Sequence, residues 1–174
     1  MPRSFDLSAD YDGSVEEVHR AFTDESYWRA RLAGSGVDVA TLESMRVGGD
    51  TGDDDTVEVV TVQVIHSHKL PGMVTQLHRG DLRIRREEVW GPVADGAAQG
   101  TVVGSILDAP VNLSGTATLL PIMETGGARL TFRATVQVRV PIIGGKLENI
   151  IGTQLAELVA AEQRFTTEWI AKTA

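Results

Sequence analysis

The segment from Lys146 to Lys172 constrains the fold most, because it is the longest stretch whose apolar residues keep helical phase. At ~100° per residue, one stripe collects the larger apolar side chains: Leu147, Ile151, Leu155, Leu158, Phe165 and Trp169. The opposite side is mostly polar or small, as in a helix with one solvent-exposed face. Gly144 and Gly145 directly precede it, so a strand is expected to end and turn there. The pattern predicts a long amphipathic helix that packs against the rest of the chain.

Alternating apolar and polar residues at positions 128–140 predict the clearest strand. One face of this strand is dry and the other carries polar and cationic side chains, which is typical of an antiparallel sheet with one side in solvent. Further strand patterns cover residues 4–9, 37–47, 56–65, 82–90, 101–107 and 111–120, with a loop expected at 94–100. Short connections favour a meander of about seven strands.

Two short helices are expected directly after the first strand. The run Ser14-Val-Glu-Glu17 is a capping box, in which the serine hydroxyl and the glutamate carboxylate satisfy each other's backbone amides. A second short helix is expected from Ser26 to Leu32, before a glycine-rich turn. We therefore predict an α+β fold in which residues 1–174 form one domain and a curved antiparallel sheet wraps around the long terminal helix.

The charge balance limits the classes of partner. The formal net charge is −8, which disfavours nucleic acid and anionic membrane surfaces as partners. The chain has no cysteine, so it has neither a disulfide framework nor a thiolate metal site. Residues 1–9 lack the apolar core of a signal peptide, and no window approaches the ~18 apolar residues of a membrane span. We expect a cytoplasmic protein without stable membrane insertion.

The order of the elements resembles that of the helix-grip superfamily, which includes START lipid-transfer domains, birch-pollen-allergen proteins and polyketide cyclases. The runs Pro141–Glu148 and Gly80–Trp90 are similar to those of an uncharacterised branch of that superfamily. The resemblance spans nearly the whole chain and implies a cavity between the sheet and the terminal helix, which would take an apolar or amphipathic small molecule. No catalytic motif of the superfamily is present to carry over.

Inward-facing apolar residues of the predicted sheet and helix are candidates to line such a cavity. They are Trp90, Leu113, Ala117, Leu130, Phe132, Leu147, Ile151, Leu155 and Leu158. The alternative is that the same residues form a filled core. The small residues at Gly115 and Ala117 favour a cavity, because a filled core would be expected to place bulk there.

Three charged residues fall on faces that are otherwise apolar. Glu162 interrupts the helix stripe, where a carboxylate is costly unless it is paired. It is either a tuned acid or ligand anchor, or a residue at the edge of the stripe that reaches solvent or pairs with an arginine. Arg86 and Glu88 share a strand face with Leu82 and Ile84. Without a bulge this pair would enter the cavity and could orient a polar head group, whereas with a bulge it would lie on the surface.

Histidines give little support for a metal site. His66 and His68 lie two positions apart, but a zinc site needs further ligands that the sequence does not place, and His78 follows only after an irregular segment. We therefore predict no metal, and His66 remains an acid–base candidate. Nucleotide-binding and nucleophile-elbow patterns are absent, so no cofactor is predicted.

The sequence favours a protein that binds or carries a hydrophobic small molecule of lipid or polyketide type. Residues from Met73 to Leu77 would form its gate. One alternative is a cyclase, dehydratase or hydrolase that uses the acid–base candidates named above, so whether there is turnover stays open. Another is a protein-interaction domain with a filled core, whose surface would be Arg129, Arg133 and Arg139. The oligomeric state is not predicted.

Overall fold

A computed structural model describes residues 2–52, 54–69, 72–77 and 80–173 of the chain. The strands are β1 (Arg3–Tyr11), β2 (Val39–Val47), β3 (Val57–Ile65), β4 (Leu82–Trp90), β5 (Ala98–Ile106), β6 (Val111–Pro121) and β7 (Ala128–Val138). The helices are α1 (Val15–Phe22), α2 (Glu25–Ala33), η1 (Ser67–Lys69), α3 (Gly72–Leu77) and α4 (Gly144–Thr173).

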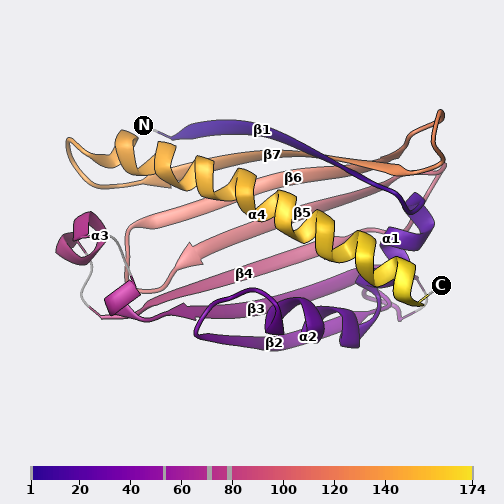
Figure 1. Ribbon diagram of the computed structural model, residues 1–174, viewed down its shortest axis with the longest axis horizontal. Helices are drawn as coiled ribbons and strands as arrows, with labels where there is room; N and C mark the ends of the chain where they lie inside the picture. The colour runs from indigo at the N-terminus through magenta and orange to yellow at the C-terminus, as the bar shows by residue number, and fades with distance from the viewer. Residues whose placement is uncertain (1, 53, 70–71, 78–79, 174) are drawn as a thin grey trace.

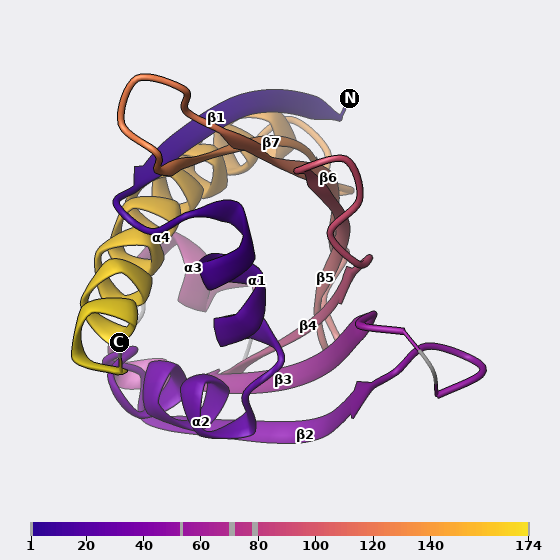
Figure 2. The same cartoon turned by 90° about the vertical axis from the view of Figure 1, so that its right-hand side faces the viewer.

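All seven strands form one antiparallel sheet in the order β1-β7-β6-β5-β4-β3-β2. From β2 to β7 each strand pairs with the next in the chain, and β1 completes the edge beside β7 (Figure 1). The sheet curves into a trough, with α4 along its open side, α1 and α2 at one end and α3 at the other (Figure 2). The predicted α+β architecture and the order of its elements are confirmed.

The helix pair α1–α2 closes one end of the trough with a packed aromatic core. As predicted, Ser14 caps α1: its hydroxyl accepts from the Glu17 amide at 3.2 Å, and the Glu17 carboxylate accepts from the Ser14 amide at 3.1 Å. The helices bury Tyr27 and Trp28, while the Phe22 ring lies 5.2 Å from the ring of Trp90 on β4. This end of the interior is filled.

α4 runs along one edge of the sheet and makes its main strand contacts with β1 and β7. Apart from Leu147, the buried residues of α4 do not belong to the predicted stripe but to a neighbouring line, which includes Glu148, Gly152, Val159 and Thr166. Gly152 lets the helix approach the ring of Phe5, because a Cβ at that position would lie 2.3 Å from the ring. Most of the predicted stripe faces the trough and is half-buried.

Most strand boundaries differ from the prediction by one to three residues, and two of the differences have a structural cause. β5 begins at Ala98, inside the segment expected to be a loop, because residues 98–100 pair with residues 117–119 of β6. Gly100 is needed there, since a Cβ would lie 2.7 Å from the Trp90 ring. β7 ends at Val138, two residues before the apolar alternation stops, and the Val138 amide donates to the buried Glu148 carboxylate of α4 at 2.9 Å.

Candidate functional site

The inner face of β4 changes from apolar to charged along its length. Leu82, Ile84, Arg86, Glu88 and Trp90 alternate on this face, and β4 pairs with β3 and β5 in unbroken register. The charged pair is therefore placed inside the trough and not on the surface, which decides between the two arrangements that the sequence allowed.

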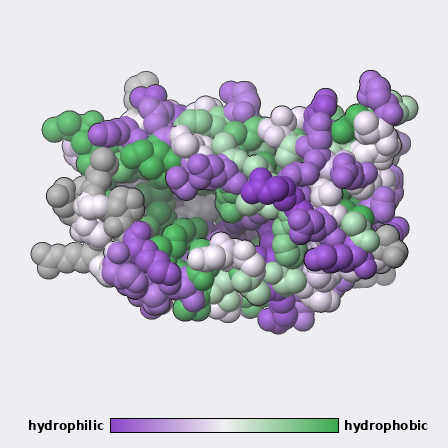
Figure 3. Space-filling view, viewed as in Figure 1, coloured by the Kyte–Doolittle hydropathy of each residue, from purple (hydrophilic) through white to green (hydrophobic). Residues whose placement is uncertain are grey.

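Toward the α3 end, the interior is lined by aliphatic side chains that are not packed against the core. Ile65 pairs with Leu82, and Ile84 pairs with Ile106, so the four form one inner patch on β3, β4 and β5. All four are only half-buried and lie outside both clusters of the hydrophobic core. Figure 3 shows a hollow between α4 and β4, beside α3, with hydrophobic surface on its walls. We call it the α4–β4 hollow.

Helix α4 contributes the other wall of the hollow. Leu158 lies one turn before Glu162, whose side chain reaches across to β4, and the two share a helix face. Leu158 is half-buried and also lies outside both core clusters. Ile151 and Leu155 are half-buried on the same side, as is Leu113 of β6.

The other predicted lining residues lie in the packed parts of the interior. Trp90, Ala117 and Phe132 are buried in the larger core cluster, with Leu130 half-buried against it, and Leu147 is buried in the smaller one. The space beside Gly115, which was taken as a sign of a cavity, is occupied by the ring of Phe132: a Cβ there would lie 2.1 Å from it.

Four charged side chains meet where the packed end gives way to the hollow, and we call them the ion cluster. Glu162 of α4 accepts two hydrogen bonds from Arg86 of β4, at 2.9 and 3.0 Å, and one from Arg31 of α2 at 2.7 Å. Glu88 Oε1 contacts Arg86 and lies 3.5 Å from Arg31 Nη2. The ion cluster therefore ties α2, β4 and α4 together across the interior.

Burial and charge oppose each other at Glu162. Loss of water around the carboxylate would raise its pKa, but the guanidinium groups of Arg31 and Arg86 outweigh this effect and lower the pKa to about 2. Glu162 is therefore an ionised partner of two arginines at neutral pH, and a poor proton donor. The sequence left Arg86, Glu88 and Glu162 open between an inward and a surface position, and it missed Arg31, which lies three positions after Trp28 on the same face of α2 and stacks over that ring at 4.6 Å.

A hydroxyl chain supports Arg31 from behind. Arg31 Nη1 donates to the Tyr27 hydroxyl at 3.2 Å, which lies 2.6 Å from Thr166 Oγ1. Because Thr166 gives its only hydroxyl hydrogen to the Glu162 carbonyl at 2.7 Å, Tyr27 is the donor to Thr166. Burial raises the pKa of Tyr27, so this hydroxyl keeps its proton.

His66 does not join the ion cluster. It follows β3 at the α3 end, five positions beyond Thr61, which pairs with Arg86, a distance of about 17 Å along an extended strand. Its ring contacts Asp81 at 3.1 Å and stacks on His68. His78 lies outside the described residues. Met73 and Leu77, which are predicted from the sequence as a gate, lie in α3 at the hollow's end of the trough, but their side chains are outside the described part of the chain.

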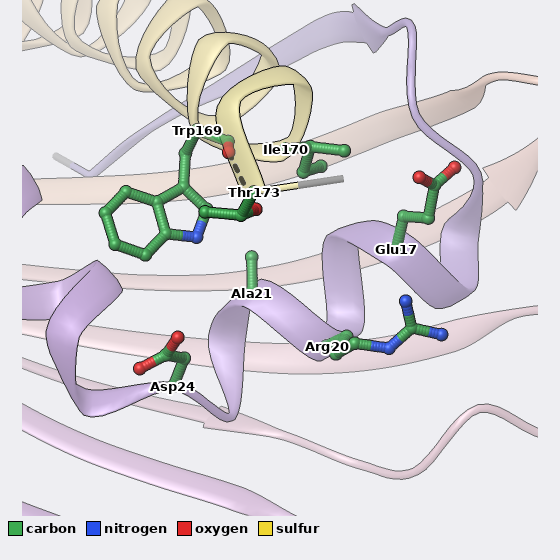
Figure 4. A pocket seen from close by; sticks show the side chains of 7 residues that line it. All are labelled: Glu17, Arg20, Ala21, Asp24, Trp169, Ile170 and Thr173. Carbon is green, nitrogen blue, oxygen red and sulfur yellow. Dashed lines mark hydrogen bonds between the residues drawn. The ribbon is translucent and has the colours of Figure 1, made fainter.

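A second depression lies at the far end of α4, away from the hollow. It has a volume of about 230 Å³ and is lined by Glu17, Arg20, Ala21, Asp24, Trp169, Ile170 and Thr173 (Figure 4). Both carboxylates already serve helix N-termini: Glu17 accepts from the Ser14 amide and Asp24 from the Ser26 amide. We therefore assign no ligand to this depression. None of the described helices is long and apolar enough to cross a bilayer.

Solved structures share this architecture at low sequence identity. TTHA0849 from Thermus thermophilus gives a TM-score of 0.63 at 15% identity, over 99% of both chains. Norcoclaurine synthase from Thalictrum flavum, in complex with dopamine and hydroxybenzaldehyde, gives 0.56 at 11%, over 100% of this chain and 89% of its own. A START superfamily protein from Mycobacterium smegmatis gives 0.54 at 10%, over 98% of this chain and 99% of its own. These likenesses show the helix-grip fold.

Closer relatives occur among mycobacterial proteins. Uncharacterised proteins of Mycobacterium tuberculosis and Mycobacterium bovis are each 69% identical to this chain over 170 residues, which cover 98% of both sequences. A family model described as a protein of unknown function, DUF2505, matches residues 6–170. The chain therefore belongs to the DUF2505 family and has the helix-grip fold that its order of elements predicted.

Proposed function

We propose that this protein binds or carries a hydrophobic or amphipathic small molecule in the α4–β4 hollow. The observation that carries the proposal is the inner patch of Ile65, Leu82, Ile84 and Ile106, which is half-buried and outside both core clusters although it faces the interior. Aliphatic side chains on an interior face normally pack at high density. An aliphatic patch that stays partly exposed beside a hollow is typical of a ligand site.

The energetics of this site would come mainly from apolar burial. A ligand that removes roughly 300 Å² of apolar surface from water gains about 7 kcal/mol, from which the cost of association is subtracted. Arg86 and Glu162 close the inner end of the hollow, each with 20% of its side chain exposed, so they could orient one polar group of the ligand. The short helix α3 would act as the gate at the outer end.

Binding is favoured over catalysis by the pairing within the ion cluster. Glu162 accepts three hydrogen bonds from two guanidinium groups, which leaves it no proton to donate at neutral pH. The fold of norcoclaurine synthase, solved in complex with dopamine and hydroxybenzaldehyde, supports small-molecule binding by an architecture of this kind.

The test uses N-phenyl-1-naphthylamine, an uncharged probe that fluoresces in apolar sites. We expect saturable binding to the wild-type protein and at least tenfold weaker binding to Leu158→Trp, in which the indole would fill the hollow. Ala156→Trp is the matched control, because Ala156 is exposed on the same helix. Absence of saturable binding to a folded wild-type protein, or equal loss in both variants, would overturn the proposal.

A further inference from the structure

The ion cluster at the inner end of the hollow is balanced in charge. Two guanidinium groups, Arg31 and Arg86, face two carboxylates, Glu88 and Glu162, in contacts of 2.7–3.5 Å and one closer Arg86–Glu88 contact. The two members that reach the hollow have opposite signs and equal exposure, since Arg86 and Glu162 each expose 20% of their side chains. A ligand group at this position therefore meets no net charge.

The cluster nevertheless has hydrogen-bond donors to offer. Arg86 gives one N–H to Glu162 Oε2, one to Glu162 Oε1 and one toward Glu88. A guanidinium carries five N–H groups, so these contacts leave two of them for a further acceptor. Both carboxylates pair with arginines, Glu162 through three hydrogen bonds and Glu88 through ion-pair contacts. The two remaining N–H groups of Arg86 suit a ligand oxygen atom that accepts hydrogen bonds.

An ionised ligand group would bind weakly beside the ion cluster. It would lose its hydration on entering the hollow, and the balanced cluster would return no net attraction to offset that cost. A hydroxyl, ketone or ester oxygen loses far less hydration and can still accept from Arg86. We propose that the ligand of the hollow is an uncharged amphipathic molecule, an aliphatic chain with a neutral oxygen-containing head group such as an alcohol or an ester, and not a carboxylate.

This inference rests on the proposed function and is tested by a matched pair of ligands. 1-Decanol and decanoate have the same chain and differ in head-group charge at ~pH 8, where the carboxylate is ionised. Each would be used to displace N-phenyl-1-naphthylamine from the wild-type protein. We expect decanol to displace the probe at least tenfold more effectively than decanoate.

Two variants at neighbouring positions then test whether the ion cluster causes the preference for decanol. Glu88→Gln removes one negative charge from the cluster and should reduce the preference for decanol at least tenfold. Glu87→Gln removes the same charge from the outer face of β4, where Glu87 pairs with Arg85 at 2.5 Å, and should leave the preference unchanged. An effect of net protein charge alone would act equally in both variants.

The outcomes separate this inference from the proposed function. Equal or tighter binding of decanoate to the wild-type protein overturns the neutral head group, while probe binding still supports the hollow. The neutral head group is also overturned if neither decanol nor decanoate displaces a bound probe, or if Glu88→Gln leaves the preference for decanol unchanged. If the probe itself does not bind, both proposals fail. The wild-type comparison decides the question even if Glu88→Gln does not fold.

Discussion

Arg86 of β4 and Glu162 of α4, 76 positions apart in the chain, join the sheet to the terminal helix through two parallel hydrogen bonds of 2.9 and 3.0 Å. A two-bond pair fixes orientation as well as distance. It sets the depth at which α4 crosses the trough and separates the aromatic core from the α4–β4 hollow. The pair is therefore both a structural tie and the inner wall of the candidate site.

Removing Glu162 should destabilise the fold strongly. Glu162→Ala leaves Arg31 and Arg86 with less opposing charge in a largely buried site, and breaking such a pair costs ~3 kcal/mol or more. Equilibrium urea unfolding would measure the loss. Glu157→Ala, on an exposed face of α4, is the control and should change stability little. Similar losses of stability in the two variants would show that the charge pairing of Glu162 does not stabilise the fold.

The same carboxylate should make stability depend on acid pH. The pKa of Glu162 is about 2 in the folded protein, against an ordinary value of 4.5 for a glutamate. Because the folded value is lower, the contribution is fully present above pH ~4.5 and is lost as the pH falls toward 2. At ~1.4 kcal/mol per pKa unit this is about 3 kcal/mol. Urea midpoints from pH 6 to pH 2 should fall more steeply for wild type than for Glu162→Gln, and parallel curves would contradict the assignment.

The hydroxyl chain formed by Tyr27 and Thr166 behind Arg31 should contribute less to folding stability than the Arg86–Glu162 ion pair. Tyr27→Phe removes the donor to Thr166 and the acceptor of Arg31, and should cost about 1 to 2 kcal/mol. A double-mutant cycle with Thr166→Val tests the link between them. If Tyr27 acts through Thr166, the double variant should lose clearly less stability than the sum of the two single losses. If the two single losses of stability simply add in the double variant, Tyr27 does not act through Thr166.

Gly152 offers a prediction in which packing overrides helix propensity. Alanine is favoured over glycine in helices by ~1 kcal/mol, yet a Cβ at position 152 would lie 2.3 Å from the Phe5 ring. Gly152→Ala should therefore destabilise the protein by about 1 to 3 kcal/mol. Gly145→Ala meets only the flexible Arg3 side chain and is the control. Thermal unfolding would compare them, and Phe5→Leu should partly rescue Gly152→Ala.

The cationic sheet face illustrates what strand patterns leave out. The alternation placed Arg129, Arg133 and Arg139 on one solvent face, as the surface of the interaction-domain alternative. In the folded protein Asp10 of β1 binds Arg129 at 2.8 and 3.1 Å, and Asp6 lies 3.6 Å from Arg133. The register of β1 against β7 gives each of these two arginines an acidic partner, and no pattern within either strand encodes that register.

The sequence by itself determined the elements and their faces, because periodicity and capping are local properties. The strict alternation of β7 and the capping box at Ser14 could both be identified from neighbouring residues, whereas the inward position of Arg86 was decided by the unbroken register of β4. The order of these elements then matched one known architecture, so the fold followed with little tertiary information.

Tertiary structure alone decided which helix face is fully covered and which charges meet. α4 is rotated so that Gly152 lies against Phe5, which leaves Leu158 facing the hollow, and Arg31 of α2 completes the ion cluster from a separate helix. These outcomes depend on ring volumes and on charges brought together across more than a hundred residues of chain. Packing and burial energies of this kind exist only after the chain has closed on itself, so local patterns carry no record of them.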